Sequence, residues 1–202
     1  MCGDPLDASL DASLDALVRR LQAACLAGGA TVALAESCTG GLVAAALTAL
    51  AGSSGYFVGG VVSYSNEAKR DLLGLDPAIL DAHGAVSAQV ARAMARGARE
   101  RFGAGVAASV TGIAGPNGGT AAKPVGLTYV GVADSDGVDV RRFVWSGDRA
   151  ANRRDSASAV VEMLLARVEA QAPRPVGTGG AASGPGIDGR PPTASGPRSD
   201  PG

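Results

Sequence analysis

The sequence predicts an α/β fold: a three-layer α/β/α sandwich with a central mixed sheet. Helix-like and strand-like patterns alternate along the chain, and an apolar stripe at 150–170 predicts a final helix packed on the sheet. The segments 124–133 and 138–145 predict two strands, and the Asp-Gly pair between them is typical of a hairpin turn. A hairpin requires an antiparallel pair, so a purely parallel sheet is not expected.

The composition indicates one globular domain and excludes several classes of partner. The 202 residues are 46% hydrophobic and carry a net charge of -1, which offers no electrostatic basis for binding nucleic acid. No apolar run reaches the roughly 20 residues that span a bilayer, and the first residues lack a signal-peptide pattern. Three cysteines without CxxC spacing suit a reducing compartment. We therefore expect a cytoplasmic protein without nucleic-acid or membrane partners.

The two ends of the chain differ from its middle. Residues 1–13 are expected to form a flexible N-terminus, although helical leucine spacing already begins within it and predicts a helix over 7–26. Residues 14–170 form the predicted domain. Residues 171–202 contain Gly, Pro, Ser, Ala and Thr with little to bury, so they are predicted to be a disordered tail.

The first half of the domain is expected to alternate strands and helices. Asn66 is the predicted N-cap of the third helix in this half, and Gly74 ends that helix. The predicted order is helix 7–26, strand 31–35, helix 42–50, strand 56–64, helix 66–73 and helix 77–82.

The second half opens with a helix whose N-cap is Ser87. Val90, Met94 and Ala98 lie on one face of this helix and are expected in the core. Its arginines are expected on a solvated face; they are Arg92, Arg96, Arg99 and Arg101. A strand at 105–110 and a glycine-rich loop at 111–120 precede the hairpin, and the segment 146–149 is expected to cap the last helix.

The turn at 36–41, Glu-Ser-Cys-Thr-Gly-Gly, is the first candidate functional site. It joins a predicted strand to a predicted helix, where unpaired N–H groups and the helix dipole favour an anion or a developing oxyanion. Glycines let the backbone approach a ligand closely. Ser37 is therefore placed to act as a nucleophile or a substrate-binding hydroxyl. The alternative is that Ser37 or Thr39 only caps the helix.

Lys69 occupies an unfavourable place in the first turn of the helix at 66–73. The helix dipole disfavours a cation there by about 0.3–1 kcal/mol. Either Lys69 is an ordinary solvated lysine, or its position lowers its pKa toward a neutral, basic form. His83 is the only histidine, so neither a Ser-His-Asp triad nor a zinc site is expected.

Five motifs together resemble one known family, the CinA C-terminal domain family of nicotinamide mononucleotide deamidases. The resemblance covers about residues 14–168. The sequence resembles the stand-alone form of the family, which lacks the molybdopterin-binding-like domain that many members carry. The motifs, in order, are AESCTGG at 35–41, VSYSNEAK at 62–69, HGAVS at 83–87, VTGIAGP at 110–116 and SGDR at 146–149.

This resemblance implies hydrolysis of the carboxamide of nicotinamide mononucleotide to nicotinate mononucleotide and ammonia, in pyridine nucleotide salvage. It implies a homodimer and no metal or other cofactor. The family's catalytic serine, tyrosine and lysine fall on Ser37, Tyr64 and Lys69 of this sequence.

The chemistry of these residue types agrees with an amidohydrolase. Lysine replaces histidine as the base in a recognised variant of the serine triad, and Lys69 would deprotonate Ser37 directly or through Tyr64. Backbone N–H groups of the turn at 38–41 would hold the oxyanion. Glu36 would position the turn, contact the ribose, or form a structural salt bridge. Arg149 would bind the phosphate or orient the nucleophile. The predicted substrate-binding residues are Glu36, Cys38, Thr39, Gly40, Gly41, Thr111, Gly112, Gly115 and Arg149.

Two other functions stay open at this stage. The first is a non-catalytic nucleotide-binding, competence- or damage-associated regulatory protein of the same fold. The second is hydrolysis of a different small amide by the same residues, with Cys38 as a second candidate nucleophile.

Overall fold

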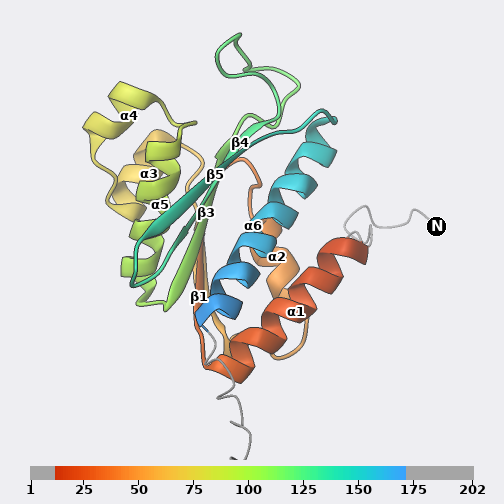
Figure 1. The fold of residues 1–202 in the computed structure, drawn as a ribbon. Coiled ribbons are helices and arrows are strands. Elements are labelled where there is room, and N and C mark those ends of the chain that lie inside the picture. Colours follow the sequence, from red (N-terminus) through yellow and green to blue (C-terminus); the bar gives the residue numbers. More distant parts are fainter. Residues whose placement is uncertain (1–11, 172–202) are drawn as a thin grey trace, which may run out of the picture.

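The computed structural model describes residues 12–171, which form one mixed sheet between two layers of helices (Figure 1). The three-layer prediction is confirmed. The strands are β1 (Val32–Glu36), β2 (Phe57–Val62), β3 (Val106–Gly112), β4 (Leu127–Ala133) and β5 (Val138–Val144). The helices are α1 (Ala12–Gly28), α2 (Leu42–Thr48), the short 3-10 helix η1 (Ser53–Gly55), α3 (Asn66–Leu73), α4 (Pro77–His83), α5 (Ala88–Phe102) and α6 (Arg149–Gln171).

The ends of the described region extend slightly past the predicted domain. Residues 12 and 13 belong to α1, and residue 171 belongs to α6. The start of the helix predicted from residue 7, the rest of the flexible N-terminus and the tail from 172 lie outside the described residues.

The sheet has five strands in the order β2-β1-β3-β4-β5. Strand β1 pairs in parallel with both β2 and β3, whereas β3–β4 and β4–β5 are antiparallel. The predicted hairpin is therefore confirmed. Because β1, β2 and β3 run in the same direction, their carboxyl ends meet at one edge of the sheet. Open sheets of this kind commonly bind ligands at such an edge.

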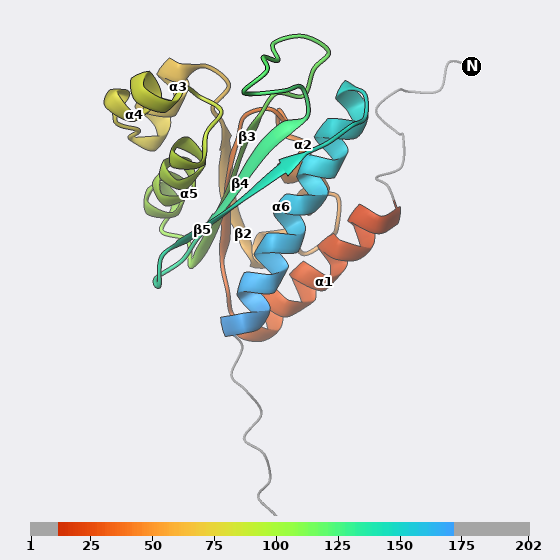
Figure 2. The same ribbon diagram turned by 45° about the horizontal axis from the view of Figure 1, so that its top comes forward.

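Each face of the sheet has its own apolar core. Helices α1, α2 and α6 cover one face, with α1 and α6 side by side, while α3, α4 and α5 cover the other (Figure 2). Residues of β1 alternate between these cores, so Leu34 packs toward α1 and α6 and Ala33 toward α5. All five β1 residues are buried, which explains the uninterrupted apolar run that predicted this strand.

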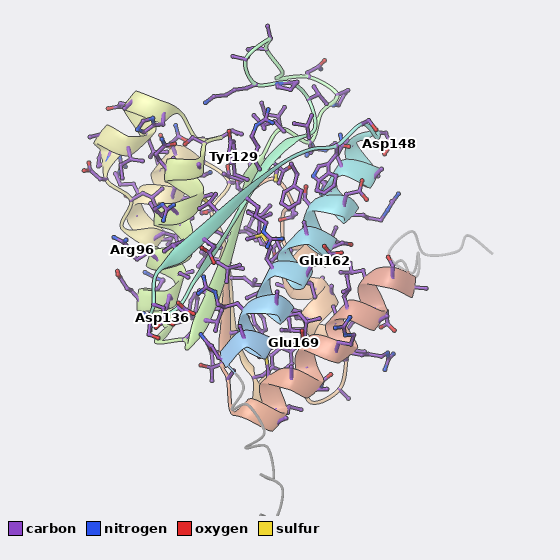
Figure 3. The ribbon with its side chains drawn as sticks, viewed as in Figure 1. Arg96, Tyr129, Asp136, Asp148, Glu162 and Glu169 are labelled. Atoms are coloured by element: carbon purple, nitrogen blue, oxygen red, sulfur yellow. The ribbon has the colours of Figure 1, made fainter. Side chains whose placement is uncertain are left out.

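The outer surfaces of both helical layers are polar. Arg96 on α5 and Glu162 and Glu169 on α6 are exposed, and Asp136 lies in the β4–β5 turn (Figure 3). The predicted solvated arginines of α5 are exposed or half-exposed, and two of them also donate to the backbone. Arg92 donates to the Val138 carbonyl and Arg99 to the Gly105 carbonyl.

The helix starts follow local capping rules with one correction. Ser87 caps α5 through a bond from the Val90 N–H, and Asp148 accepts from the Ala151 N–H at the start of α6, as predicted. Asn66 was the wrong residue for the α3 cap. Ser65 has the extended backbone of an N-cap, and its hydroxyl accepts the Ala68 N–H at 3.1 Å.

Gly97 lies where α5 crosses α3, and a side chain has no room there. A Cβ at this position would collide with the carbonyl oxygen of Leu73. We expect Gly97→Ala to reduce the free energy of unfolding by about 1–3 kcal/mol through overpacking, measured by urea denaturation. Gly28→Ala is the matched control, because this helical glycine has nothing within 4 Å of an added Cβ. Equal stability of both variants would contradict the close α3–α5 contact.

Candidate active site

A cavity of about 270 Å³ opens at the edge where the parallel strands end. Its walls come from the β1–α2 turn, the β2–α3 connection, the segment before α5, the end of β3 with its following loop, and the start of α6. In Figures 1 and 2 the loop between β3 and β4 projects beyond this edge. The lining residues are Ser37, Cys38, Tyr64, Lys69, Ala85, Val86, Thr111, Gly112, Ile113, Ala114, Gly115, Asn117, Gly118 and Arg149.

Ser37 and Lys69 meet in this cavity although 32 positions separate them in the chain. The Lys69 Nζ lies 3.1 Å from the Ser37 Oγ. Strand β1 delivers Ser37 at its carboxyl end, and the parallel neighbour β2 leads into α3, which carries Lys69. The parallel pairing of β1 and β2 therefore brings the two side chains together.

Lys69 is a buried lysine, with only 1% of its surface exposed. Its Nζ also donates to the backbone carbonyls of Ser63 at 2.7 Å and Tyr64 at 3.3 Å. No carboxylate forms an ion pair with it among the described residues. Burial lowers the pKa of Lys69, and nearby Cys38 opposes this effect weakly. Of the two readings of Lys69, the solvated lysine is therefore wrong.

Glu36 holds the start of α2. Its carboxylate accepts the N–H groups of Gly41 at 2.9 Å, Val43 at 3.2 Å and Ala44 at 2.8 Å. The side chain is buried and has no ion pair in the described part of the chain. Of its three predicted roles, positioning the turn fits these contacts. The salt bridge is wrong, and a ribose contact is not supported because Glu36 does not line the cavity.

Only part of the turn can present N–H groups to a ligand. Gly40 donates its N–H to the Ser37 carbonyl at 3.1 Å, and Gly41 donates to Glu36. Within the described residues, the N–H groups of Cys38 and Thr39 make no backbone hydrogen bond. Of the N–H groups expected to hold an oxyanion, those of Gly40 and Gly41 are therefore occupied, whereas among residues 12–171 those of Cys38 and Thr39 interact only with the Cys38 sulfur.

Cys38 lines the cavity but is a poor nucleophile. Burial raises the pKa of its thiol to about 12, against smaller lowering effects from the N–H groups of Cys38 itself and Thr39. The reactive form of cysteine is the thiolate, so this environment suppresses its reactivity.

Tyr64 and Arg149 lie at the rim of the cavity. Tyr64 is 60% exposed, and its hydroxyl accepts a hydrogen bond from the Arg149 Nη2 at 3.2 Å. The Nη1 of Arg149 donates to the Gly115 carbonyl at 2.9 Å. Lys69 contacts Tyr64 only through the Tyr64 backbone carbonyl. These contacts place the tyrosine hydroxyl with the arginine rather than between the lysine and Ser37.

Thr111 and Gly112 form the wall beside β3. The buried Thr111 hydroxyl donates to the Ala85 carbonyl at 2.7 Å, which ties this wall to the segment before α5. A Cβ at Gly112 would lie 2.7 Å from the Leu127 carbonyl oxygen and 3.1 Å from the Cys38 sulfur. A side chain at this position would therefore collide first with β4, at the Leu127 carbonyl and the Thr128 hydroxyl, and would also press on the Cys38 side chain.

Eight of the predicted site residues line one cavity, and four lie behind it. The four outside the lining are Glu36, Thr39, Gly40 and Gly41. Side-chain contacts with a substrate are not supported for Glu36 and Thr39, because the Glu36 carboxylate faces α2 and the Thr39 side chain is fully buried. The N–H groups of Gly40 and Gly41 are bound within the turn, which leaves only the Thr39 N–H of these four residues without a backbone or carboxylate acceptor in the described part of the chain.

Six lining residues were not predicted individually, although they lie in the HGAVS motif or the glycine-rich loop; they are Ala85, Val86, Ile113, Ala114, Asn117 and Gly118. Sequence reasoning also missed the Ser63 carbonyl, since a backbone acceptor has no signal in residue type.

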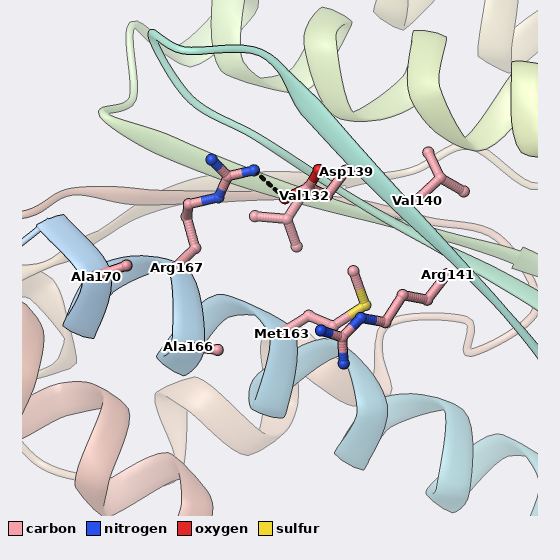
Figure 4. Close-up of a pocket in the computed structure, with 8 residues that line it drawn as sticks. All are labelled: Val132, Asp139, Val140, Arg141, Met163, Ala166, Arg167 and Ala170. Atoms are coloured by element: carbon pink, nitrogen blue, oxygen red, sulfur yellow. Dashed lines mark hydrogen bonds and ion pairs between the residues drawn. The ribbon is translucent and has the colours of Figure 1, made fainter.

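A larger hollow of about 480 Å³ lies between β5 and α6, away from these groups (Figure 4). Among its charged side chains, Arg167 pairs with Asp139 and with Asp134, and Arg141 extends from β5. Met163, Ala166 and Ala170 line the helix side. Because its lining contains no serine, threonine, cysteine or lysine among the described residues, this hollow is not the candidate active site.

Two further features concern the described residues only. Nowhere between residues 12 and 171 do three His, Cys, Asp or Glu side chains cluster in a way that could hold a metal ion. Over the same range, no helix combines the length and apolarity needed to cross a membrane.

Replacing the Glu36 carboxylate should loosen the turn. In Glu36→Gln an amide N–H₂ would face backbone N–H donors, which leaves buried donors unpaired. We expect the free energy of unfolding to fall by about 1–3 kcal/mol, measured by urea denaturation. The exposed Glu162→Gln in the middle of α6 is the control and should leave stability nearly unchanged. Full stability of Glu36→Gln would show that the three N–H bonds contribute little.

The sequence of this chain matches one protein family and several curated relatives. The CinA C-terminal domain family matches residues 14–168. A CinA-like protein of Geobacter sulfurreducens is 49% identical over 166 residues, covering 82% of this chain and 40% of the relative. A putative competence-damage inducible protein of Moorella thermoacetica is 49% identical over 141 residues, covering 70% of this chain and 34% of the relative. The chain thus spans well under half the length of these curated relatives.

Solved structures agree with the sequence comparison. The crystal structure of competence/damage inducible protein CihA from Agrobacterium tumefaciens has a TM-score of 0.75 and 42% identity, covering 82% of this chain and 98% of that one. A CinA superfamily protein from Klebsiella pneumoniae has the same TM-score with 32% identity, covering 78% and 98%. Since the family match extends over most of the chain and the fold agrees, this protein belongs to the CinA C-terminal domain family.

Proposed function

We propose that this protein is a serine amidohydrolase that converts nicotinamide mononucleotide to nicotinate mononucleotide and ammonia, as expected in pyridine nucleotide salvage. The observation that carries the proposal is the 3.1 Å contact between the Ser37 hydroxyl and the buried amine of Lys69, at the floor of a cavity. The choice of substrate rests on the resemblance of the surrounding motifs to the deamidase family.

The surroundings of Lys69 suit a general base. A neutral amine has two N–H donors and one lone pair. The carbonyls of Ser63, Tyr64 and Ser65 lie 2.7, 3.3 and 3.5 Å from the amine. When the two nearest carbonyls accept its two hydrogens, the lone pair is left for the Ser37 hydroxyl proton. Burial without a carboxylate partner favours the neutral amine, because the charged form loses its solvation. Direct proton transfer from Ser37 to Lys69 is therefore the route we propose, without relay through Tyr64.

The reaction then proceeds in two halves. Ser37 Oγ attacks the carboxamide carbon as Lys69 takes the hydroxyl proton, and the N–H groups of Cys38 and Thr39 hold the oxyanion. Such donors contribute about 2.7–4 kcal/mol each. The C–N bond breaks, and the Lys69 ammonium gives its proton to the departing nitrogen, which leaves as ammonia. Water attacks the acyl-serine, Lys69 accepts its proton and returns it to Ser37, and nicotinate mononucleotide is released.

The charge at the rim of the cavity is consistent with an anionic substrate. Arg149 is the cation in the lining that is not needed for proton transfer, and its guanidinium is held by Gly115 and Tyr64. We propose that Arg149 contacts the phosphate of the nucleotide while Tyr64 orients it.

The direct test is release of ammonia from nicotinamide mononucleotide by the purified protein, with nicotinate mononucleotide measured in parallel by chromatography. Stoichiometric formation of both products is expected. If the protein released ammonia from another small amide but none from the nucleotide, nicotinamide mononucleotide would be rejected as the substrate. The proposed amide hydrolysis by Ser37 and Lys69 would still stand.

A second candidate function follows from the printed names of relatives. Several are named competence- or damage-inducible, which favours a regulatory protein of the same fold. Binding of nicotinamide mononucleotide without release of ammonia at substrate excess would favour this reading over hydrolysis.

A further inference from the structure

The first turns of α6 fasten two walls of the cavity. Arg149 donates to the Gly115 carbonyl, and the buried Asn152 donates to the Ala114 carbonyl, so both hold the loop that follows β3. Arg153 reaches the opposite wall. Its Nε and Nη2 donate to the carbonyl of Thr39, at 3.1 Å and 2.6 Å. These are the hydrogen bonds that the Arg153 guanidinium makes among the described residues.

The Thr39 carbonyl is connected to the reacting atoms through two planar peptide groups. The carbonyl of Thr39 and the N–H of Gly40 belong to one peptide plane, so holding one end orients the other. The Gly40 N–H in turn donates to the Ser37 carbonyl at 3.1 Å. That carbonyl shares a peptide plane with the N–H of Cys38, which is one of the two donors assigned to the oxyanion.

We propose that Arg153 is a positioning residue that sets the orientation of the Ser37–Cys38 peptide. This inference rests on the proposed hydrolysis. Arg153 touches neither the substrate nor Ser37 Oγ, and it does not line the cavity. It acts through the Thr39–Gly40 peptide, fixing the Cys38 N–H toward the developing oxyanion and the serine toward Lys69. A charge-assisted, two-donor contact is well suited to hold one carbonyl in a single orientation.

The arrangement predicts a loss of turnover rather than of binding. A misplaced oxyanion donor weakens the transition state and leaves the rim contacts unchanged. Arg153→Met is expected to lower kcat about 10- to 100-fold, with KM within about twofold of the wild type. Arg153→Lys keeps one donor for the Thr39 carbonyl and should recover part of this loss.

The test combines kinetics with amide hydrogen exchange. Steady-state kinetics on nicotinamide mononucleotide are measured for the wild type, Arg153→Met, Arg153→Lys and the control Arg154→Met, whose side chain is the exposed neighbour on α6. Exchange in a peptide spanning 37–44 is followed by mass spectrometry. Faster exchange and lower kcat are expected for Arg153→Met, an intermediate result for Arg153→Lys, and wild-type behaviour for Arg154→Met.

Failure of this inference is distinguishable from failure of the proposed function. A wild type that releases no ammonia from the nucleotide rejects the proposed function. In that case exchange in Arg153→Met still tests whether Arg153 holds the turn: faster exchange supports this role, and wild-type exchange rejects it. Wild-type kcat and wild-type exchange in both Arg153 variants would overturn the inference. An equal loss in Arg154→Met would also overturn it, since the effect would then be general to the helix.

Discussion

Ser37→Ala is expected to remove nearly all deamidase activity, lowering kcat by about 10⁴-fold or more. The hydroxyl is the nucleophile in the proposed mechanism, and the other cavity-lining side chains that could attack are the Cys38 thiol and the hydroxyls of Thr111 and Tyr64. The Tyr64 hydroxyl is bound to Arg149 at the rim. The thiol is held protonated by burial, and the Thr111 hydroxyl is bound to the Ala85 carbonyl. Initial rates of ammonia release at saturating nicotinamide mononucleotide measure the effect.

The matched control for this variant is Cys38→Ala. It removes the neighbouring sulfur while keeping the serine, its base and the backbone N–H groups, so kcat should stay close to the wild-type value. Iodoacetamide should likewise leave activity largely intact. Activity that survives in Ser37→Ala but disappears in Cys38→Ala would move the nucleophile from the serine to the cysteine.

Lys69→Met is expected to lower kcat about 10²- to 10⁴-fold, because no other base contacts the Ser37 hydroxyl among the described residues. The methionine preserves the length and apolar stem of the side chain. The wild-type kcat/KM should rise with pH as Lys69 loses its proton, since only the neutral amine accepts one. That rising limb should be absent from the residual activity of Lys69→Met. An unchanged pH profile in the variant would assign the base to another group.

The same pKa shift has a consequence for stability. Burial lowers the pKa of Lys69 in the folded protein below that of the unfolded chain, which is about 10.4. Between these two values the unfolded chain binds more protons, so the free energy of unfolding rises with pH through this window. Below the folded-state pKa the lysine is protonated in both the folded and the unfolded protein. The free energy of unfolding is then lowest, because the folded state holds a buried charge.

This linkage is measured as the difference in free energy of unfolding between wild type and Lys69→Met. The difference should move in favour of the wild type as pH increases from the folded-state pKa toward about 10.4. Exposed Lys123→Met is not a suitable control, because its amine donates to the His83 carbonyl. Arg154→Met serves instead, since its charge is constant over this range.

Much of the framework was predictable because its causes are local. Ser87 caps α5, Gly74 ends α3 in a left-handed conformation, and the Asp134–Gly137 turn forms the hairpin. Each depends on residues within a few positions of one another. The apolar run of β1 likewise predicted a strand buried on both faces. Ser65 displaced Asn66 as the α3 cap because two adjacent residues of similar capping ability cannot be separated by residue type.

The candidate site was predictable in its residue types but not in its contacts. The motifs identified Ser37, Lys69, Tyr64 and Arg149, and all four line one cavity. The sequence could not show that the Glu36 carboxylate would accept the N–H groups of Gly41, Val43 and Ala44, or that the Gly40 N–H would bind within the turn.

The sequence by itself determined the alternation of elements, the mixed sheet and the family, because these depend on periodicity, turn residues and long motifs. Only the tertiary structure decided that Lys69 is buried against Ser37 and that Arg153 holds the Thr39 carbonyl from 114 positions away. Such contacts depend on which strands pair in parallel and on how α6 packs against the β1–α2 turn. The burial that lowers the pKa of Lys69 is a property of the packed chain, and so is the hydrogen bond from Arg153 that holds the turn. Neither can be assigned to a single segment.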